Sequence, residues 1–331
     1  MRRLLYLCLI TLAFAECKPE HQSQSEKAIN ADFEGYAMVI HGGAGTILKE
    51  NMDHAKEEAY KLALNRALGI GEKILDEGGA SIDAVEAVIN YLENNPLFNA
   101  GRGAVYNING QHELDASIMT GHDQKAGAVG GVMNLKNPIS AARAVMEKSE
   151  HVLMVGRGAE QFSIAHGLDT VDQAYYHTDR RLYQKNQAPS TGSIQVTHDE
   201  KFGTVGCVAL DRSGNICAGT STGGMTNKKY NRIGDSPIIG AGTYADNAQC
   251  GISCTGHGEY FIRYAVAHDI AARMEYKGIT LASAAHEVVM RKLKAKGGSG
   301  GIVGLDANGN VSMVFNTPGM YRAYNLSLIH I

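Results

Sequence analysis

The chain has 331 residues and a formal net charge of −3, which fits one large α/β domain or two small ones with a sizeable core. A charge this close to neutral gives no basic footprint for nucleic acid, so we expect a small-molecule substrate and no nucleic-acid partner. The 39 glycines cluster in short runs, which indicates either tight turns or backbone that lies close to a ligand.

Residues 1–15 have the pattern of a secretory signal peptide. They open with two arginines, continue with an apolar run too short to span a bilayer, and end in Ala-Phe-Ala, a small-x-small cleavage pattern. We expect export, to a periplasm in a Gram-negative source, with a flexible polar segment over 16–35 and no membrane association after cleavage. Cys17 leaves open a lipidated cysteine, for which the preceding glutamate is a poor neighbour.

The first half of the chain alternates helical and extended patterns. In order, we expect a strand at 37–40, a glycine-rich loop at 41–45, helices at 53–77 and 81–93, a loop at 94–103, a hairpin of 104–107 with 113–119, a strand at 126–133, and helices at 138–148 and 158–166. From 169 to 203 the sequence is polar and aperiodic, and we interpret it as a flexible linker that marks either a domain boundary or a processing site.

After the linker the hydrophobic period changes to two. We expect a hairpin of 205–210 with 216–220, a strand at 250–255, helices at 257–276 and 280–296, and a hairpin of 301–305 with 311–315. Strands, then helices, then strands on both sides of the linker favour an α+β fold in which two stacked sheets lie between helical layers.

Six cysteines are present, and none has the spacing of a zinc site. Cys207 and Cys217 fall on neighbouring expected strands, so an oxidising compartment allows a disulfide, although buried free thiols are the favoured state. The state of Cys250 and Cys254 stays open.

The glycine-rich loop at 41–45 follows a strand, as phosphate-binding loops do. Its sequence matches neither G-x-G-x-x-G nor a P-loop, so a structural turn is favoured over nucleotide binding.

Thr204 follows the polar linker directly and opens a strand flanked by Gly203 and Gly206. A threonine at a strand start is usually structural because β-branched residues favour strands. If the chain were cut before it, however, its free α-amino group would have an ordinary pKa near 8 and could activate its own hydroxyl.

Arg232 and Asp235 are opposite charges in a glycine-containing loop. They fit either a surface ion pair or recognition of an amino-acid head group, with arginine on the carboxylate and aspartate on the ammonium. Residues 255–259 end a strand and open a helix, where a hydroxyl and a backbone N–H can form an oxyanion hole.

Together these motifs resemble the plant-type L-asparaginase and isoaspartyl peptidase family, a branch of the threonine-type N-terminal nucleophile hydrolases. The matching stretches run in family order and are residues 41–45, 98–101, 113–116, 125–129, 203–206, 220–227, 232–237, 255–259, 297–301 and 315–317. The resemblance implies a four-layer αββα sandwich, self-cleavage between Gly203 and Thr204 into parts 36–203 and 204–331 of one domain, and a homodimer of the cleaved units.

The resemblance also implies an amidohydrolase for isoaspartyl dipeptides and L-asparagine. Thr204 would attack the side-chain amide and form an aspartyl-enzyme, from which water releases L-aspartate. The helpers that it implies are Thr222 for the nucleophile, Thr255 and Gly256 for the oxyanion, and Arg232, Asp235, Gly258 and Asn99 for substrate binding.

Catalysis by this family needs no cofactor, but the resemblance implies a structural sodium ion in the loop at 92–102. Its ligands would be main-chain carbonyls of Leu92, Glu93, Phe98, Ala100 and Arg102.

Two alternatives stay open: a glycosylasparaginase, from which residues 223–225 depart, and a non-catalytic exported amino-acid-binding protein. A protease of the threonine-aspartase type has no specific support. The chain also departs from the family pattern over 325–331, which we interpret as a non-native tail that puts the last strand in doubt.

Overall fold

The computed structural model describes residues 33, 35–48, 50, 52–187 and 203–327. The expected signal peptide, Cys17, most of the segment at 16–35, residues 188–202 of the linker and the last four residues lie outside the described residues. None of the helices within these ranges is both long and apolar enough to cross a membrane.

The described chain forms two sheets. The larger one has the order β11 (Gly319–Leu326), β1 (Ala37–Gly45), β5 (Val205–Leu210), β6 (Ile216–Thr222), β2 (Leu114–Thr120), β3 (Ala126–Val132) and β4 (Leu153–Val155). The smaller one has the order β10 (Val311–Phe315), β9 (Gly300–Asp306), β8 (Cys250–Gly256) and β7 (Thr243–Ala245).

The helices are α1 (His54–Asp76), α2 (Ser81–Glu93), α3 (Pro138–Lys148), α4 (Gly156–Ala165), α5 (Asp179–Gln187), α6 (Gly258–Tyr264), α7 (Val266–Lys277) and α8 (Leu281–His286). A π-helical segment, Glu287–Leu293, continues α8, and 3₁₀ turns occur at Gly101–Gly103 and Gln173–Tyr176.

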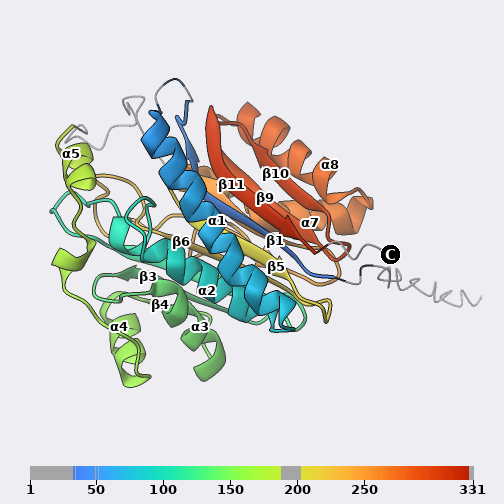
Figure 1. The fold of residues 1–331 in the computed structure, drawn as a ribbon, viewed down its shortest axis with the longest axis horizontal. Helices are drawn as coiled ribbons and strands as arrows, with labels where there is room; N and C mark the ends of the chain where they lie inside the picture. The colour runs from blue at the N-terminus through green and yellow to red at the C-terminus, as the bar shows by residue number, and fades with distance from the viewer. Residues whose placement is uncertain (1–32, 34, 49, 51, 188–202, 328–331) are drawn as a thin grey trace, which may run out of the picture.

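The sheets lie face to face between two helical layers. In Figure 1, α1, α2 and α3 cover one side of the large sheet, while α7 and α8 lie beyond β9 and β10. Alternate residues of one strand enter different cores: Met38 and Ile40 pack with the α1–α4 layer, and Val39 packs between the sheets. The expected four-layer αββα fold is therefore confirmed.

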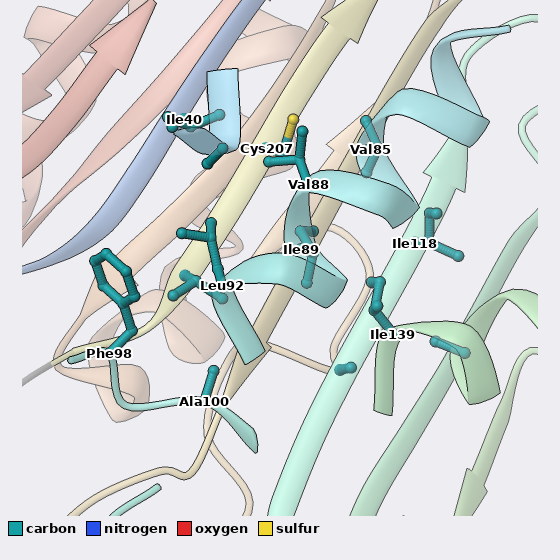
Figure 2. Close-up of a cluster of buried hydrophobic side chains, with 14 of the residues drawn as sticks. Ile40, Val85, Val88, Ile89, Leu92, Phe98, Ala100, Ile118, Ile139 and Cys207 are labelled. Carbon is teal, nitrogen blue, oxygen red and sulfur yellow. The ribbon is translucent and has the colours of Figure 1, made fainter. Parts of the chain in front are cut away.

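The core under α2 shows why this segment is helical and how it is oriented. Val85, Val88, Ile89 and Leu92 recur at helical spacing, so all four side chains lie on one face and pack on the large sheet, where Figure 2 shows Cys207 of β5 among them. This packing places the end of α2 beside the loop that carries Asn99.

Several sequence predictions about elements were wrong. Residues 41–45 are not a loop but the second half of β1, and they pair with β11 through an irregularity between His41 and Gly43. Residues 104–107 form no strand, because β2 pairs with β3 and β6 instead of closing a hairpin at Gly110. The helix at 257–276 is divided at Ala265, whose φ is 47°.

The linker is partly structured. The 3₁₀ turn Gln173–Tyr176 and the helix α5 occupy the first part of the segment expected to be flexible at 169–203. Tyr176 is fully buried and donates a hydrogen bond to the carbonyl oxygen of Leu135 at 2.7 Å, which anchors this segment to the domain.

The last strand, which the unusual tail put in doubt, is present as β11. β11 pairs with β1 from Gly45–Gly319 to Ala37–Leu326, so Asn325 and Leu326 of the unusual tail belong to the large sheet. The short strands β4 and β7 were not predicted from the sequence, because three-residue strands carry little periodic signal.

The four described cysteines are buried free thiols. Cys207 lies opposite Gly219 and Cys217 lies opposite Ala209, so these two sulfurs are offset along the ladder.

Candidate active site

Thr204 and Thr222 meet where β5 begins and β6 ends. The ladder pairs Val205 with Ser221, which places the two threonines opposite each other on neighbouring strands. The Thr204 hydroxyl donates to Thr222 Oγ1 at 3.1 Å, and the N–H of Gly224 donates to the same oxygen at 3.1 Å. Thr222 thus accepts two hydrogen bonds and keeps its own hydroxyl hydrogen for a further partner.

The Gly203–Thr204 junction is enclosed by two other segments. A Cβ added to Gly43, whose φ is +108°, would lie 2.6 Å from the Cα of Gly203, and a Cβ added to Gly203 would lie 2.9 Å from the Cβ of Asn99. β1 and the loop that carries Asn99 therefore approach the junction so closely that only glycine fits at Gly43 and Gly203.

Asn99 ties the loop after α2 to the end of β6. Its Nδ2 donates to the carbonyl oxygen of Gly224 at 2.8 Å, and its backbone carbonyl accepts from the N–H of Gly223 at 3.0 Å. Its Oδ1 accepts from the N–H of Val105 at 2.9 Å. Asn99 therefore supports this wall of the site.

Thr255 and Gly256 reach the site from the smaller sheet. Thr255 is fully buried, and its Oγ1 accepts from the N–H of Ala44 in β1 at 3.2 Å. Since Ala44 follows Gly43, this bond brings Thr255 to the strand that faces the Gly203–Thr204 junction. A Cβ on Gly256 would lie 2.5 Å from the carbonyl oxygen of Ser299, so this position also requires glycine.

Arg232, Asp235 and Gly258 form a compact cradle. A Cβ on Gly258 would lie 2.7 Å from Nη2 of Arg232 and 2.9 Å from Oδ1 of Asp235. Asp235 is buried, and its Oδ2 has no hydrogen-bond partner among the described residues. Glu259, whose role the sequence did not suggest, binds Arg232 through two hydrogen bonds of 2.8 and 2.9 Å.

The charges of this cradle are strongly shifted. Burial raises the pKa of Asp235 to about 7 against the opposing influence of Arg232. Partial burial disfavours the charge of Glu259, but hydrogen bonds from His257 and Arg232 outweigh it and hold its pKa well below the usual range. A buried carboxylate with an unpartnered oxygen beside a guanidinium is suited to a ligand that carries an ammonium and a carboxylate.

The sequence also did not identify three buried charged residues near Thr222 as candidate site residues. Asp115 lies directly opposite Thr222 on β2, and its Oδ2 is 4.0 Å from Nζ of Lys228. Lys228 donates to the carbonyl oxygen of Glu113 at 2.9 Å and lies 3.5 Å from that glutamate's Oε2. Lys228 lies 115 positions from Glu113, so no spacing signal relates the lysine to the two carboxylates.

In the loop expected to hold sodium, some of the main-chain carbonyl oxygens face glycines of the same loop. The carbonyl oxygen of Glu93 lies against Gly101 and that of Phe98 against Gly103, where no Cβ fits. The carbonyl oxygen of Ala100 accepts from the N–H of Gly103 at 3.2 Å. Among the described residues no cluster of His, Cys, Asp and Glu side chains could hold a metal, so any cation here would use main-chain oxygens.

The stacked sheets between helical layers, with polar residues gathered where β5 starts, define the N-terminal nucleophile class of hydrolases. The chain belongs to the asparaginase family, whose model matches residues 34–328.

Individual relatives agree with this assignment. The chain is 50% identical over 294 residues to an isoaspartyl peptidase of Salmonella typhimurium, covering 87% of this chain and 94% of the relative. It is 50% identical to the isoaspartyl peptidase of Escherichia coli, with 87% and 92% covered. It is 42% identical over 302 residues to a plant-type L-asparaginase of Pyrococcus horikoshii, with 87% and 95% covered.

Proposed function

We propose that this protein cuts its own chain between Gly203 and Thr204 and then hydrolyses isoaspartyl dipeptides and L-asparagine, with Thr204 as the nucleophile. The observation that carries the proposal is the 3.1 Å hydrogen bond between the hydroxyls of Thr204 and Thr222, made directly after the enclosed glycine junction. The names of the relatives, isoaspartyl peptidase and plant-type L-asparaginase, support the substrate class.

The first step creates the catalytic base. In the continuous chain the nitrogen of Thr204 is a peptide nitrogen and cannot take a proton. Attack of Oγ1 on the carbonyl carbon of Gly203 transfers the acyl group from nitrogen to oxygen, and water then hydrolyses the ester. The products are a carboxylate on Gly203 and a free α-amino group on Thr204, whose ordinary pKa near 8 suits a base.

Substrate binding uses the charged cradle. Arg232 holds the α-carboxylate and the unpartnered Oδ2 of Asp235 accepts from the α-ammonium, which satisfies a buried acceptor that is unpaired among the described residues. Gly258 leaves room for the substrate between them. The bond from the N–H of Ala44 to Thr255 and the close approach of Gly43 to Gly203 support a substrate side chain that extends toward Thr204.

The amine of Thr204 takes the hydroxyl proton as Oγ1 attacks the side-chain carbonyl carbon of the substrate. The hydrogen of the Thr255 hydroxyl and the N–H of Gly256 stabilise the oxyanion, and Thr222 orients the nucleophile. The amine passes its proton to the leaving nitrogen, which departs as ammonia or an amino acid. Water, activated by the same amine, hydrolyses the aspartyl ester and releases L-aspartate.

Denaturing electrophoresis and N-terminal sequencing test this proposal. Purified protein should give two bands, and the smaller fragment should begin Thr-Val-Gly. Thr204→Ala should give one band and release no aspartate from an isoaspartyl dipeptide or from L-asparagine. A matched control, Thr120→Ala, removes a buried hydroxyl from β2 outside the site and should be cut and active. An active Thr204→Ala protein would refute Thr204 as nucleophile.

We propose further that the loop at 92–102 binds a sodium ion through main-chain carbonyls, including those of Glu93 and Phe98. Oxygen ligands suit a hard cation, and the loop must be glycine at Gly101 and Gly103 for these oxygens to face inward. Replacing sodium by choline in the buffer should lower the Tm, and Gly103→Ala should abolish that sodium dependence. An equal Tm in both salts would refute a bound sodium.

The assembly and the cellular location are also proposals. We propose a homodimer of cleaved units, tested by light scattering of the mature protein. We propose export through the segment at 1–15, tested by fractionating cells and sequencing the mature N-terminus. A protein that keeps Met1 and stays with the cell interior would refute export.

A further inference from the structure

A line of buried polar side chains runs between the two sheets, starting at the carbonyl oxygen of Thr204. In order, its members are His41, Ser253, Thr220, Thr243 and Ser117. Every one of them is fully buried. The links measure 3.1, 3.0, 2.6, 2.6 and 2.8 Å, and Ser117 Oγ also lies 2.6 Å from the carbonyl oxygen of Ser236, next to Asp235. The line therefore connects the nucleophile with the head-group cradle.

Strand pairing explains how the line arises. His41 of β1, Gly206 of β5, Thr220 of β6 and Ser117 of β2 lie opposite one another across four strands. Gly206 has no side chain, and a Cβ there would collide with both the His41 ring and the Ser253 hydroxyl. The ring of His41 therefore crosses above Gly206, with one nitrogen reaching Thr204 and the other reaching Ser253 of the smaller sheet.

The chemistry of the first link determines the tautomer of His41. A carbonyl oxygen can only accept, so the hydrogen must lie on Nδ1 of the ring. Burial lowers the pKa of His41 to about 3, so the ring carries a single hydrogen at neutral pH and Nε2 is an acceptor. The hydroxyl of Ser253 donates to that nitrogen. Ser253 thus holds the ring in the one tautomer that can bind Thr204.

We propose that His41 is a positioning residue that fixes the orientation of Thr204 after self-cleavage, a role that rests on the proposed function of Thr204 as nucleophile. Once the bond to Gly203 is cut, Thr204 keeps one covalent neighbour, Val205. Rotation about the N–Cα bond of Val205 would then swing the carbonyl, the amine and the hydroxyl of Thr204 together away from the substrate. A hydrogen bond to the Thr204 carbonyl opposes this rotation, and the line of buried hydroxyls holds the donor in place.

The test compares two replacements of His41 that keep different halves of the ring. In His41→Asn the amide nitrogen takes the place of Nδ1 and keeps the bond to Thr204. In His41→Gln the amide lies near Nε2 and keeps only the Ser253 side. We expect kcat per mole of cleaved chain to fall about fivefold in His41→Asn, from loss of one buried bond, and about 100-fold in His41→Gln, from misplacement of the nucleophile.

KM for L-asparagine should change less than about twofold in both variants, because Arg232 and Asp235 are untouched. His112 supplies the matched control: it is also a buried histidine, but its ring nitrogen faces the carbonyl oxygens of Ala104 and Val105. His112→Asn and His112→Gln should lower Tm without separating in kcat. A His41→Gln protein as active as His41→Asn, or a loss that appears in KM, would overturn the assignment.

The tautomer itself is measured without any need for activity. Uncut Thr204→Ala protein labelled with ¹⁵N-histidine keeps the backbone carbonyl at position 204, so His41 should show the Nδ1–H form. The His41 signal is assigned as the one that disappears when His41→Asn is added to Thr204→Ala. An Nε2–H signal would overturn the proposal even if both His41 variants resist cleavage. Aspartate release by Thr204→Ala would instead overturn the proposed function and leave the tautomer result standing.

Discussion

Replacing Asp235 with asparagine should stabilise the substrate-free protein at alkaline pH while removing its affinity for a substrate ammonium. Asp235 is buried, and its pKa is raised from 3.8 to about 7 because burial disfavours the carboxylate. A rise of about 3 pKa units corresponds to a ceiling of about 4 kcal/mol of destabilisation when the group is ionised. An asparagine amide without a partner there costs about 1–3 kcal/mol, which leaves a net gain of about 1–3 kcal/mol at pH 8.

The sign of the pH dependence follows from the direction of the shift. Because the folded protein binds this proton more tightly than the unfolded chain, the free energy of unfolding falls as pH rises between about 4 and 7. From pH 5 to pH 8 the Asp235 contribution should therefore fall by about 3 kcal/mol. Asparagine does not titrate, so the variant should lack this loss.

Urea unfolding at pH 5 and pH 8 measures the effect, with the Thr204→Ala background used for both proteins to keep the chain intact. L-Aspartate should raise the midpoint of the parent at pH 8 and leave Asp235→Asn unchanged, since the ligand's ammonium has lost its acceptor. Parallel pH dependence in the two proteins, or equal stabilisation by aspartate, would refute the assignment of a buried, titrating Asp235 to substrate binding.

Three other changes give distinct outcomes. Thr222→Val removes the acceptor of the Thr204 hydroxyl and should lower kcat about 100-fold with little change in Tm, a reading contradicted if self-cleavage and turnover are both normal. Glu259→Gln keeps the shape of the Arg232 partner but removes its charge, so KM for L-asparagine should change while the sodium dependence of Tm does not. Glu93→Gln should lower the free energy of unfolding by about 1–3 kcal/mol. Glu93 accepts hydrogen bonds from Ser221, Asn137 and Ile139, whereas an amide offers only one acceptor oxygen. An unchanged urea midpoint would count against this.

Local patterns predicted much of the secondary structure. The helix expected at 53–77 spans His54–Asp76, and Asp53 caps it by accepting from the N–H of Lys56 at 2.7 Å. The hairpins of β5 with β6 and of β9 with β10 were confirmed, because alternating apolar residues and a short polar turn are encoded within a few residues. Family motifs indicated Thr204, Arg232 and Asp235 as candidate site residues, and the structure places Arg232 and Asp235 around Gly258.

Other features depend on partners distant in the chain. Residues 41–45 are rich in glycine and suggest a loop, yet they are strand because β11 pairs with β1 as far as Gly45, while β5 pairs with it as far as His41. Burial between layers, which no single segment specifies, raises the pKa of Asp235 and lowers that of His41.

The sequence by itself determined the layered class of fold, and it indicated the Gly203–Thr204 junction and the residue types suited to amide chemistry, because these depend on periodicity and on motifs read within short windows. Three hydrogen bonds were decided only by the tertiary structure. The Thr204 hydroxyl donates to Thr222, Arg232 donates to Glu259, and His41 donates to the carbonyl oxygen of Thr204. These contacts join residues from 18 to 163 positions apart, and they exist because strand pairing and the stacking of two sheets bring those positions to one buried place.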